Sequence, residues 1–239
     1  MLSACGQHDA GGVASTSAVA EAPPVARAVE SFESECGRRL LPTKMEVKAL
    51  PSAINYNFDS TMARLTVQGT RQKKLGQIVL GLTEATMHTN IQWNSNMLVE
   101  SSTGKTCMRP QLTMTLSVAP QVVSVAREFE QGSCAFNDIA SHEMRHVRAN
   151  QDQLEETAGV LQQELEGFFG QRIFYGQRDQ LRSQLEQALR GTWLPHAQAE
   201  LDKVNLKHNA IDSPEEYARN KAVCNGAITK AIYDADLIR

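Results

Sequence analysis

The sequence predicts an α+β fold in which a β-rich N-terminal half packs on one helix of a long antiparallel helical hairpin. Residues 31–130 contain short runs in which polar and apolar residues alternate, which is the period of a half-buried strand. From Cys134 to about Phe169 the chain has no proline, and apolar residues recur at helical spacing. We therefore expect one domain over residues 31–239, with its strands in residues 31–130 and its helices in residues 131–239.

The segments expected to form strands follow one another closely, with turn residues between some of them. Asp59-Ser60-Thr61 and Gly104-Lys105-Thr106 are expected to form turns. Pro120 separates the last two segments, because proline has no N–H group to donate to a neighbouring strand. The expected strands are residues 53–58, 64–67, 77–82, 89–93, 112–118 and 121–127.

The C-terminal half carries start and stop signals for three helices. Ser133 is a good N-cap for the first helix, and residues 167–177 are expected to form the turn after it. A second helix is expected over about residues 178–207, where Pro195 should kink or split it. Ser213-Pro214-Glu215-Glu216 combines an N-cap, a proline at the first helical position and a capping-box glutamate, so it predicts the start of a third helix.

The N-terminus suggests attachment to a membrane by a lipid. Leu2-Ser3-Ala4-Cys5-Gly6 resembles the lipobox of bacterial lipoproteins, in which the cysteine is lipidated. Only Met1 precedes this run, so we expect that the chain is truncated or begins at a misplaced methionine. Residues 6–30 are rich in Gly, Ala, Ser and Pro, which suits a flexible tether. Residues 1–30 are therefore interpreted as a lipobox remnant and a tether.

The cysteines favour an oxidising compartment. If Cys5 carries a lipid, four of the five cysteines remain, and they can form two disulfides in three ways. We favour Cys107–Cys134, which flank a predicted strand pair, and Cys36–Cys224, which lie near the two ends of the folded part. The location expected is the bacterial cell envelope, as a periplasmic or outer-membrane lipoprotein, or the medium after secretion. Four buried thiols in a cytosolic protein are the alternative.

Charge and hydropathy argue against two classes of partner. The formal net charge is −3, so no basic excess is available to hold the phosphate backbone of a nucleic acid. No segment approaches the roughly 20 apolar residues needed to span a membrane. We therefore expect no nucleic-acid partner, and a membrane contact only through a lipid on Cys5.

The chemistry of the chain is indicated by Ser141-His142-Glu143-Met144-Arg145-His146, which contains the pattern His-Glu-x-x-His on the first predicted helix. Residues four apart lie on the same helix face, so the imidazoles of His142 and His146 can reach one ion. Catalytic zinc takes three protein ligands and keeps one position for water, whose pKa it lowers. Glu143 is then placed to act as the general base. The sequence thus predicts a Zn²⁺ site and hydrolysis.

A peptide is the expected substrate, because a predicted strand comes directly before the metal helix. Residues 121–129 are the candidate for an edge strand that holds an extended peptide through main-chain hydrogen bonds. Tyr217 is a candidate for polarising the scissile carbonyl, and ordinary packing is its other interpretation.

These residues resemble the zincin metallopeptidases, and in particular bacterial secreted or lipoprotein zinc-dependent protease-like domains of unknown function. The resemblance is specific over about residues 122–150 and only architectural elsewhere. It implies a zincin-like domain and a zinc endopeptidase, with His142 and His146 as ligands and Glu143 as general base. The competing interpretation is a non-catalytic envelope lipoprotein that docks a partner and keeps a vestigial or structural metal site.

The third metal ligand is inferred from which residues of the return helix should face the motif in the expected hairpin. With a turn near residue 172, the motif should face Glu200 and His208, which lie on one stripe of the return helix. We take His208 as the ligand and keep Glu200 and Glu166 as alternatives. In an unbroken helix Glu166 would lie about 30 Å from His146. Asp212 is expected to orient a ligand or simply to precede the Ser213 cap.

Overall fold

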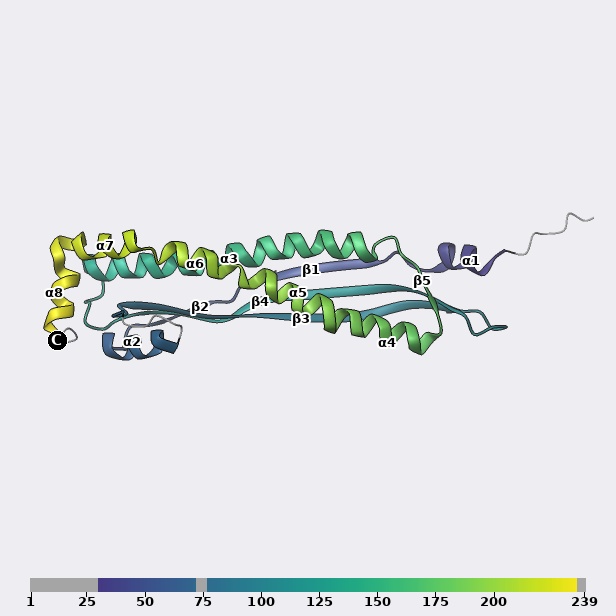
Figure 1. The fold of residues 1–239 in the computed structure, drawn as a ribbon, viewed down its shortest axis with the longest axis horizontal. Coiled ribbons are helices and arrows are strands. Elements are labelled where there is room, and N and C mark those ends of the chain that lie inside the picture. Colours follow the sequence, from purple (N-terminus) through teal and green to yellow (C-terminus); the bar gives the residue numbers. More distant parts are fainter. Residues whose placement is uncertain (1–29, 72–76, 236–239) are drawn as a thin grey trace, which may run out of the picture. The chain divides into compact units, whose positions relative to one another are not determined.

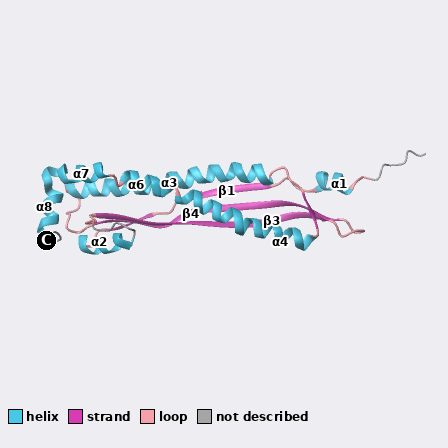
Figure 2. Ribbon diagram, viewed as in Figure 1, coloured by secondary structure: helices cyan, strands magenta, loops and turns pink. Residues whose placement is uncertain are grey.

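The computed structural model describes residues 30–71 and 77–235, and residues 32–239 form one compact unit. The lipid attachment predicted at Cys5 and the tether predicted up to residue 30 lie outside the described residues, apart from Glu30 itself. The unit combines long helices with a mixed sheet, which confirms the α+β prediction at a coarse level (Figure 2).

The sheet is built around β4 (Thr106–Val125), which has neighbours along both of its edges (Figure 1). On one edge β4 pairs antiparallel with β3 (Gly81–Val99). On its other edge β4 pairs in turn with β5 (Phe174–Gly176), which is antiparallel, and with β1 (Lys44–Leu50) and β2 (Ile54–Asn57), which are parallel. The sheet is therefore three strands wide, and β4 is its central strand throughout.

Two segments predicted as separate strands on either side of Pro120 form the single strand β4. The pairing with β3 shifts at this point, so that Ala119 and Pro120 lie opposite Thr86 alone. The extra residue forms a β-bulge, and a bulge is one of the few places where a strand tolerates a proline without a donor N–H. Pro120 therefore marks an irregularity within the strand and not its end.

The segment 64–67 was predicted as a strand, and this prediction was wrong, because it lies in α2 (Met62–Arg71). Thr61 Oγ1 accepts a hydrogen bond from the backbone N–H of Arg64, as at a helix N-cap. Met62 and Leu65 are fully buried three residues apart, whereas Val67 is 62% exposed. A run of four alternating residues is too short to distinguish a strand from a helix. The burial of Met62 and Leu65, three residues apart, is the spacing of one helix face.

The first helix agrees with the prediction: α3 spans Cys134–Phe169, and Ser133 Oγ accepts a hydrogen bond from the backbone N–H of Phe136. The return segment is divided near Pro195, as predicted, with a π-helical turn before the proline. Its pieces are α4 (Arg178–Ala188), η1 (Leu189–Trp193), α5 (Leu194–Asp202) and α6 (Val204–Ile211).

The remaining helices lie at the two ends of the chain. Ser213 caps α7 (Pro214–Ala222) by accepting a hydrogen bond from the N–H of Glu216, as the sequence predicts. The other helical elements are α1 (Phe32–Arg39), η2 (Val223–Gly226) and α8 (Ala227–Asp234). None of the described helices is long and apolar enough to cross a membrane.

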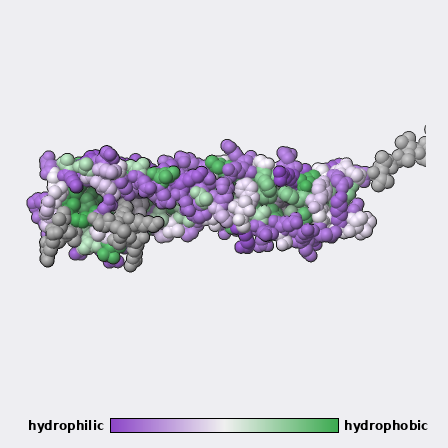
Figure 3. All heavy atoms as spheres, in the orientation of Figure 1, coloured by the Kyte–Doolittle hydropathy of each residue, from purple (hydrophilic) through white to green (hydrophobic). Residues whose placement is uncertain are grey.

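Hydrophobic packing fixes α3 and the return segment against the sheet. Alternate residues of β4 from Leu112 to Val118 are buried, and they share one core with α3, α4 and α5. A second cluster packs α2 and α8 around the first turns of α3. The face of the molecule seen in Figure 3 is mostly hydrophilic, with hydrophobic residues in small separate patches. The first core places α3 along the sheet and so sets the position of the His-Glu-x-x-His motif.

The disulfide connectivity differs from the one we favoured. The bonds are Cys36–Cys107 and Cys134–Cys224, with Cα–Cα distances of 6.3 and 5.7 Å. Cys107 lies at the start of β4 and Cys134 follows its end, and the 19 residues from Cys107 to Val125 span about 60 Å as a strand. A bond between Cys107 and Cys134 is therefore impossible. The presence of two disulfides indicates an oxidising or extracellular compartment.

Candidate metal centre

Two histidines and one aspartate converge on a single point. His142 and His146 lie one turn apart on α3, and Asp212 is the C-cap residue of α6. The Nε2 atoms of the two histidines are 3.3 Å apart, and Asp212 Oδ1 lies 3.1 Å from Nε2 of His142 and 3.3 Å from Nε2 of His146. The three residues thus form a group that could hold a metal ion.

The spacing of the three atoms can be compared with that around a metal. Zinc binds imidazole nitrogen and carboxylate oxygen at about 2.0–2.2 Å, so two ligands of a tetrahedral ion lie about 3.3–3.5 Å apart. The distances of 3.1–3.3 Å in this group are close to that separation. Both histidines are also buried, which limits competition from water. The donor atoms therefore fit a divalent ion of the size of zinc.

The electrostatics around His142 favour a positive charge. Burial by itself lowers the pKa of the His142 imidazole. The hydrogen bond with Asp212 and the charge of Glu143 outweigh burial, and the pKa is raised above its ordinary value. The same carboxylates that attract a proton to this point would attract a metal cation.

Asp212 lies at the third position of the group, where we expected His208. His208 is nearby, but its Nδ1 lies 2.9 Å from Nδ1 of His146, whereas the converging atoms are the Nε2 atoms. The two nitrogens of an imidazole point in different directions, so His208 contacts His146 from outside the group. Asp212 therefore takes the place of the third ligand, which the sequence suggested for His208. His208 takes the place of a residue that orients a ligand, which the sequence suggested for Asp212.

The two alternatives for the third ligand also lie outside the group. Glu200 pairs with Lys203 at 2.5 Å, and its main-chain carbonyl accepts a hydrogen bond from Gln153 at 2.9 Å. Because α3 is unbroken up to Phe169, Glu166 lies about 30 Å along the helix from His146.

A chain of hydrogen bonds orients His146. Nε2 of His208 lies 3.0 Å from Oδ1 of Asn150, a buried residue of α3. Since this oxygen only accepts, His208 donates through Nε2, and its Nδ1 accepts a hydrogen bond from Nδ1 of His146. His146 then presents an unprotonated Nε2 to the group, which is the form that binds a metal.

Glu216 and Arg145 both contact the ring of His142. Glu216 Oε1 lies 3.1 Å from Nδ1 of His142, and Arg145 Nη2, which can only donate, lies 2.8 Å from the same nitrogen. Glu216 also pairs with Arg145 and Arg219. The pKa of Glu216 falls to about 2, and the largest cause is the hydrogen bond from Arg219. Burial raises this pKa, whereas the hydrogen bonds with His142 and Arg145 lower it further. Glu216 is therefore ionised near neutral pH, and together with Arg145 it contacts Nδ1 and fixes the position of the His142 ring.

This pKa predicts how stability depends on pH. Ionised Glu216 stabilises the folded state above its ordinary pKa of 4.5, and this contribution is lost as the pH falls from about 4.5 to about 2. In urea unfolding of the metal-free protein, the wild type should exceed Glu216→Gln in stability at pH 6. The difference should shrink below pH 4.5. A difference that stays constant down to pH 2 would contradict the assignment.

Glu143 lies between α3 and β3, where it is 3% exposed. Thr83 Oγ1 of β3 donates a hydrogen bond to Glu143 Oε2 at 2.8 Å. Gly81 permits this close approach, because a Cβ there would lie 2.7 Å from Ile139 Cγ2 and 2.8 Å from Glu143 Cγ. The sequence pattern singled out neither Thr83 nor Gly81; a glycine within the apolar run 77–82 was the only signal.

Glu143 lines a cleft of about 970 Å³ together with two members of the metal group, His146 and Asp212. One wall is the outer edge of β3, and the opposite wall is formed by α5 and α6. Uncharged polar side chains dominate its lining. The cleft is lined by Gln77, Thr83, Ala85, Thr86, Met87, Glu143, His146, Asn150, Gln198, Asp202, Val204, Asn205, His208, Asn209, Asp212 and Tyr217.

Tyr217 also contributes a proton donor to the cleft. Burial, followed by the charge of Asp212, raises the pKa of Tyr217 to about 12. The phenol therefore keeps its proton at neutral pH, and it donates a hydrogen bond to Gln77 Oε1 at 3.3 Å. A protonated phenol in this position can donate to another acceptor that enters the cleft.

The edge strand beside the site is not the one predicted. Residues 121–125 belong to β4, which is flanked there by β2 and β3, and residues 126–129 follow its end. Among the described strands, β3 pairs with β4 alone, so its other edge carries no strand. The edge strand at the cleft is therefore β3 over Thr83–Met87.

Comparisons with known proteins give no relative from which a function could be transferred. No family model matches the chain, and it matches neither a curated protein nor a solved structure. The geometry of the site is therefore the basis for assigning a function.

Proposed function

We propose that this protein is a zinc-dependent hydrolase that cleaves peptide bonds, of the zincin type that the motif resembles. The observation that carries the proposal is the convergence of His142, His146 and Asp212, of which His146 and Asp212 line one cleft with the buried Glu143. Within the described residues the group offers three ligand atoms. Three ligands are typical of catalytic zinc sites, whereas structural sites are usually closed by four.

His142, His146 and Asp212 would hold the ion, and the orientation of the His146 imidazole supports this assignment. Zinc supplies Lewis acidity, which makes water acidic enough to ionise near neutral pH. Glu143 follows His142 directly and would accept the proton of the attacking water. Glu143 would then pass that proton to the leaving amine. The hydrogen bond from Thr83 holds Oε2 of Glu143 in place, and Oε1 would have to carry the proton.

The shape and lining of the cleft favour an extended peptide as substrate. A peptide added along β3 would form main-chain hydrogen bonds with the edge at Thr83–Met87. The amide side chains of the opposite wall, such as Asn205 and Asn209, can hydrogen-bond the peptide without selecting one charge. Tyr217 would donate its O–H to the carbonyl oxygen that becomes negatively charged in the transition state.

The cell envelope is the location that fits best with this activity. The two disulfides need an oxidising compartment, and the lipobox-like run at Cys5 would attach the domain to a membrane. In this location the protein would act on envelope or extracellular peptides.

The proposal is tested by incubating the zinc-loaded full chain with an unfolded, carboxymethylated protein and identifying new termini by mass spectrometry. We expect internal cleavage that stops when a chelator removes the metal and returns when zinc is added back. If the zinc-loaded protein cleaves nothing, the peptidase proposal is wrong. The group would then support the competing interpretation of an envelope lipoprotein that binds a metal without catalysis.

A further inference from the structure

The helix that follows Asp212 is held against α3 by polar and covalent contacts. Neither α7 nor η2 contains a buried residue. The nearest buried side chains along the chain are Val204 in α6 and Ile228 in α8. Apart from the partly buried Val223 of η2, which packs against the second cluster, the contacts that hold these two elements on α3 are polar or covalent.

The contacts between the two segments form a regular ladder. On α3 the contributing residues lie four apart, so they form one stripe along a single helix face. The segment from Cys224 back to His208 runs antiparallel to this stripe and meets it about once per turn. The pairs are Cys134 with Cys224, Asp138 with Arg219, His142 with Glu216, His146 with Asp212, and Asn150 with His208.

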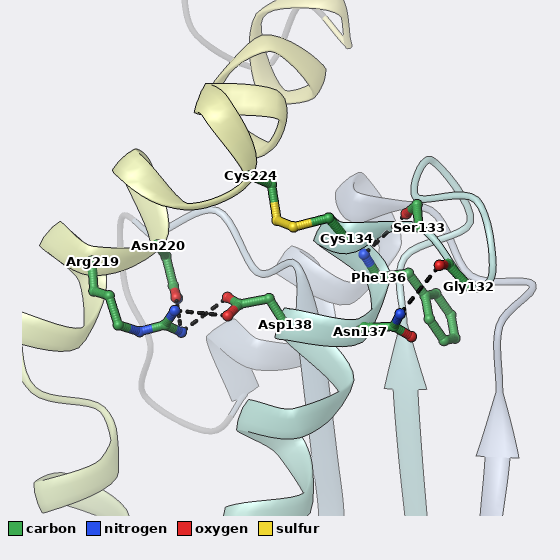
Figure 4. Close-up of a disulfide and its surroundings, with 9 residues drawn as sticks. All are labelled: Gly132, Ser133, Cys134, Phe136, Asn137, Asp138, Arg219, Asn220 and Cys224. Carbon is green, nitrogen blue, oxygen red and sulfur yellow. Dashed lines mark hydrogen bonds and ion pairs between the residues drawn. A yellow bond between two sulfur atoms is a disulfide. The ribbon is translucent and has the colours of Figure 1, made fainter.

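At one end of this ladder, the first turns of α3 meet α7 and η2 (Figure 4). Cys134 and Cys224 are joined covalently, and Arg219 donates two hydrogen bonds to Asp138, at 2.7 and 2.9 Å. The same guanidinium also pairs with Glu216, one turn nearer to the metal group. Arg219 therefore connects the disulfide end of the ladder to the carboxylate that orients His142.

The backbone at Cys224 supports a role for the disulfide. Cys224 and Asn225 have φ values of 55° and 54°, and Gly226 has a φ of 75°. Glycine and asparagine adopt this left-handed conformation readily, but a cysteine does so at a cost in free energy. Such a residue persists where its surroundings hold it, and the bond to the first turn of α3 does so here.

We propose that the Cys134–Cys224 disulfide and Arg219 position the metal group: they hold α7 in register with α3 and so place Asp212 and Glu216 against the two histidines. This inference rests on the proposed metal site. It predicts that the affinity for zinc depends on a covalent bond between residues that are not ligands. Arg219 is thus a positioning residue that acts through Glu216 and Asp138.

The test compares zinc dissociation constants, measured by competition with a chromophoric chelator, for the full chain and for Cys134→Ser/Cys224→Ser. Serine is used because free thiolates would themselves bind zinc. Zinc binding should weaken by about 10- to 100-fold, the range found when groups that orient a ligand are removed. Arg219→Met, which keeps the disulfide, should weaken it by about tenfold.

The matched control is Cys36→Ser/Cys107→Ser. The two disulfides close loops of similar length, with sequence separations of 71 and 90, so their loss should destabilise the fold to a similar degree. Cys107 lies at the start of β4, away from the metal group, and zinc affinity should remain within about twofold of the wild type.

The outcomes separate this inference from the proposed function. If the wild type binds zinc and Cys134→Ser/Cys224→Ser and Arg219→Met bind it equally well, the inference is wrong and the metal site stands. An equal loss of affinity in the control would also overturn it, since the effect would then be one of general stability. If Cys134→Ser/Cys224→Ser does not fold, the Arg219→Met result decides. A wild type that binds no zinc overturns the proposed metal site itself.

Discussion

Replacing Glu143 with glutamine is expected to lower the rate of peptide hydrolysis by about 10²–10⁴-fold while zinc binding and the fold are retained. Glutamine has nearly the same shape, and its carbonyl oxygen can still accept the hydrogen bond from Thr83 Oγ1. It cannot accept a proton at neutral pH. The change therefore removes the proposed general base and leaves the packing between α3 and β3 intact.

The measurement is kcat/KM on a peptide identified in the cleavage experiment, with zinc content determined on the same samples. Glu166→Gln is the matched control, because it makes the same substitution at an exposed site on the same helix, away from the cleft. Glu166→Gln should behave as the wild type does. Full activity in Glu143→Gln would show that another group takes the proton, and the assigned mechanism would be wrong.

Replacing Asp212 with alanine is expected to weaken zinc binding by more than about 100-fold, whereas His208→Ala should weaken it by about 10- to 100-fold. The difference follows from their positions. Asp212 contributes an atom to the converging group, and His208 contacts the group through Nδ1 of His146. Removal of a ligand should therefore cost more affinity than removal of a group that orients one.

Competition titrations of the two variants decide between these roles. Asp202→Ala is the matched control, because Asp202 lines the same cleft but is not a member of the metal group. Its affinity should equal that of the wild type. A larger loss in His208→Ala than in Asp212→Ala would restore His208 as the third ligand, as the sequence first suggested.

Local signals in the sequence predicted the helical half of the fold well. The span of α3, the caps at Ser133 and Ser213, and the division of the return segment near Pro195 all depend on residues close together in the chain. The pair His142 and His146 also follows from spacing on one helix. Such features need no knowledge of what lies across the fold.

Features that depend on partners distant in the sequence were harder to predict. The edge strand and the disulfides required the length and the order of the strands, and β4 proved to be one central strand that passes through Pro120. The sequence suggested Asp212 only as a residue that orients a ligand or precedes the Ser213 cap. The helical segment continues to Ile211, and this extra turn brings Asp212 opposite His142 and His146.

One signal for the site was present in the sequence and was not used. The stripe on α3 whose members meet α6, α7 and η2 repeats every four residues, so it can be read along a single helix face. This stripe predicts that the segment after the return helix lies along the whole face of α3 that carries these residues, and not only against the two histidines. Its members are Cys134, Asp138, His142, His146 and Asn150.

The most direct test of the metal site is zinc K-edge X-ray absorption on the zinc-loaded protein, together with its metal content. We expect one zinc per chain, with two imidazole ligands and oxygen ligands at about 2.0–2.2 Å, and no sulfur. Three imidazoles would place His208 in the site instead of Asp212. A protein that takes up no zinc, or that binds it through sulfur, would contradict the site formed by His142, His146 and Asp212.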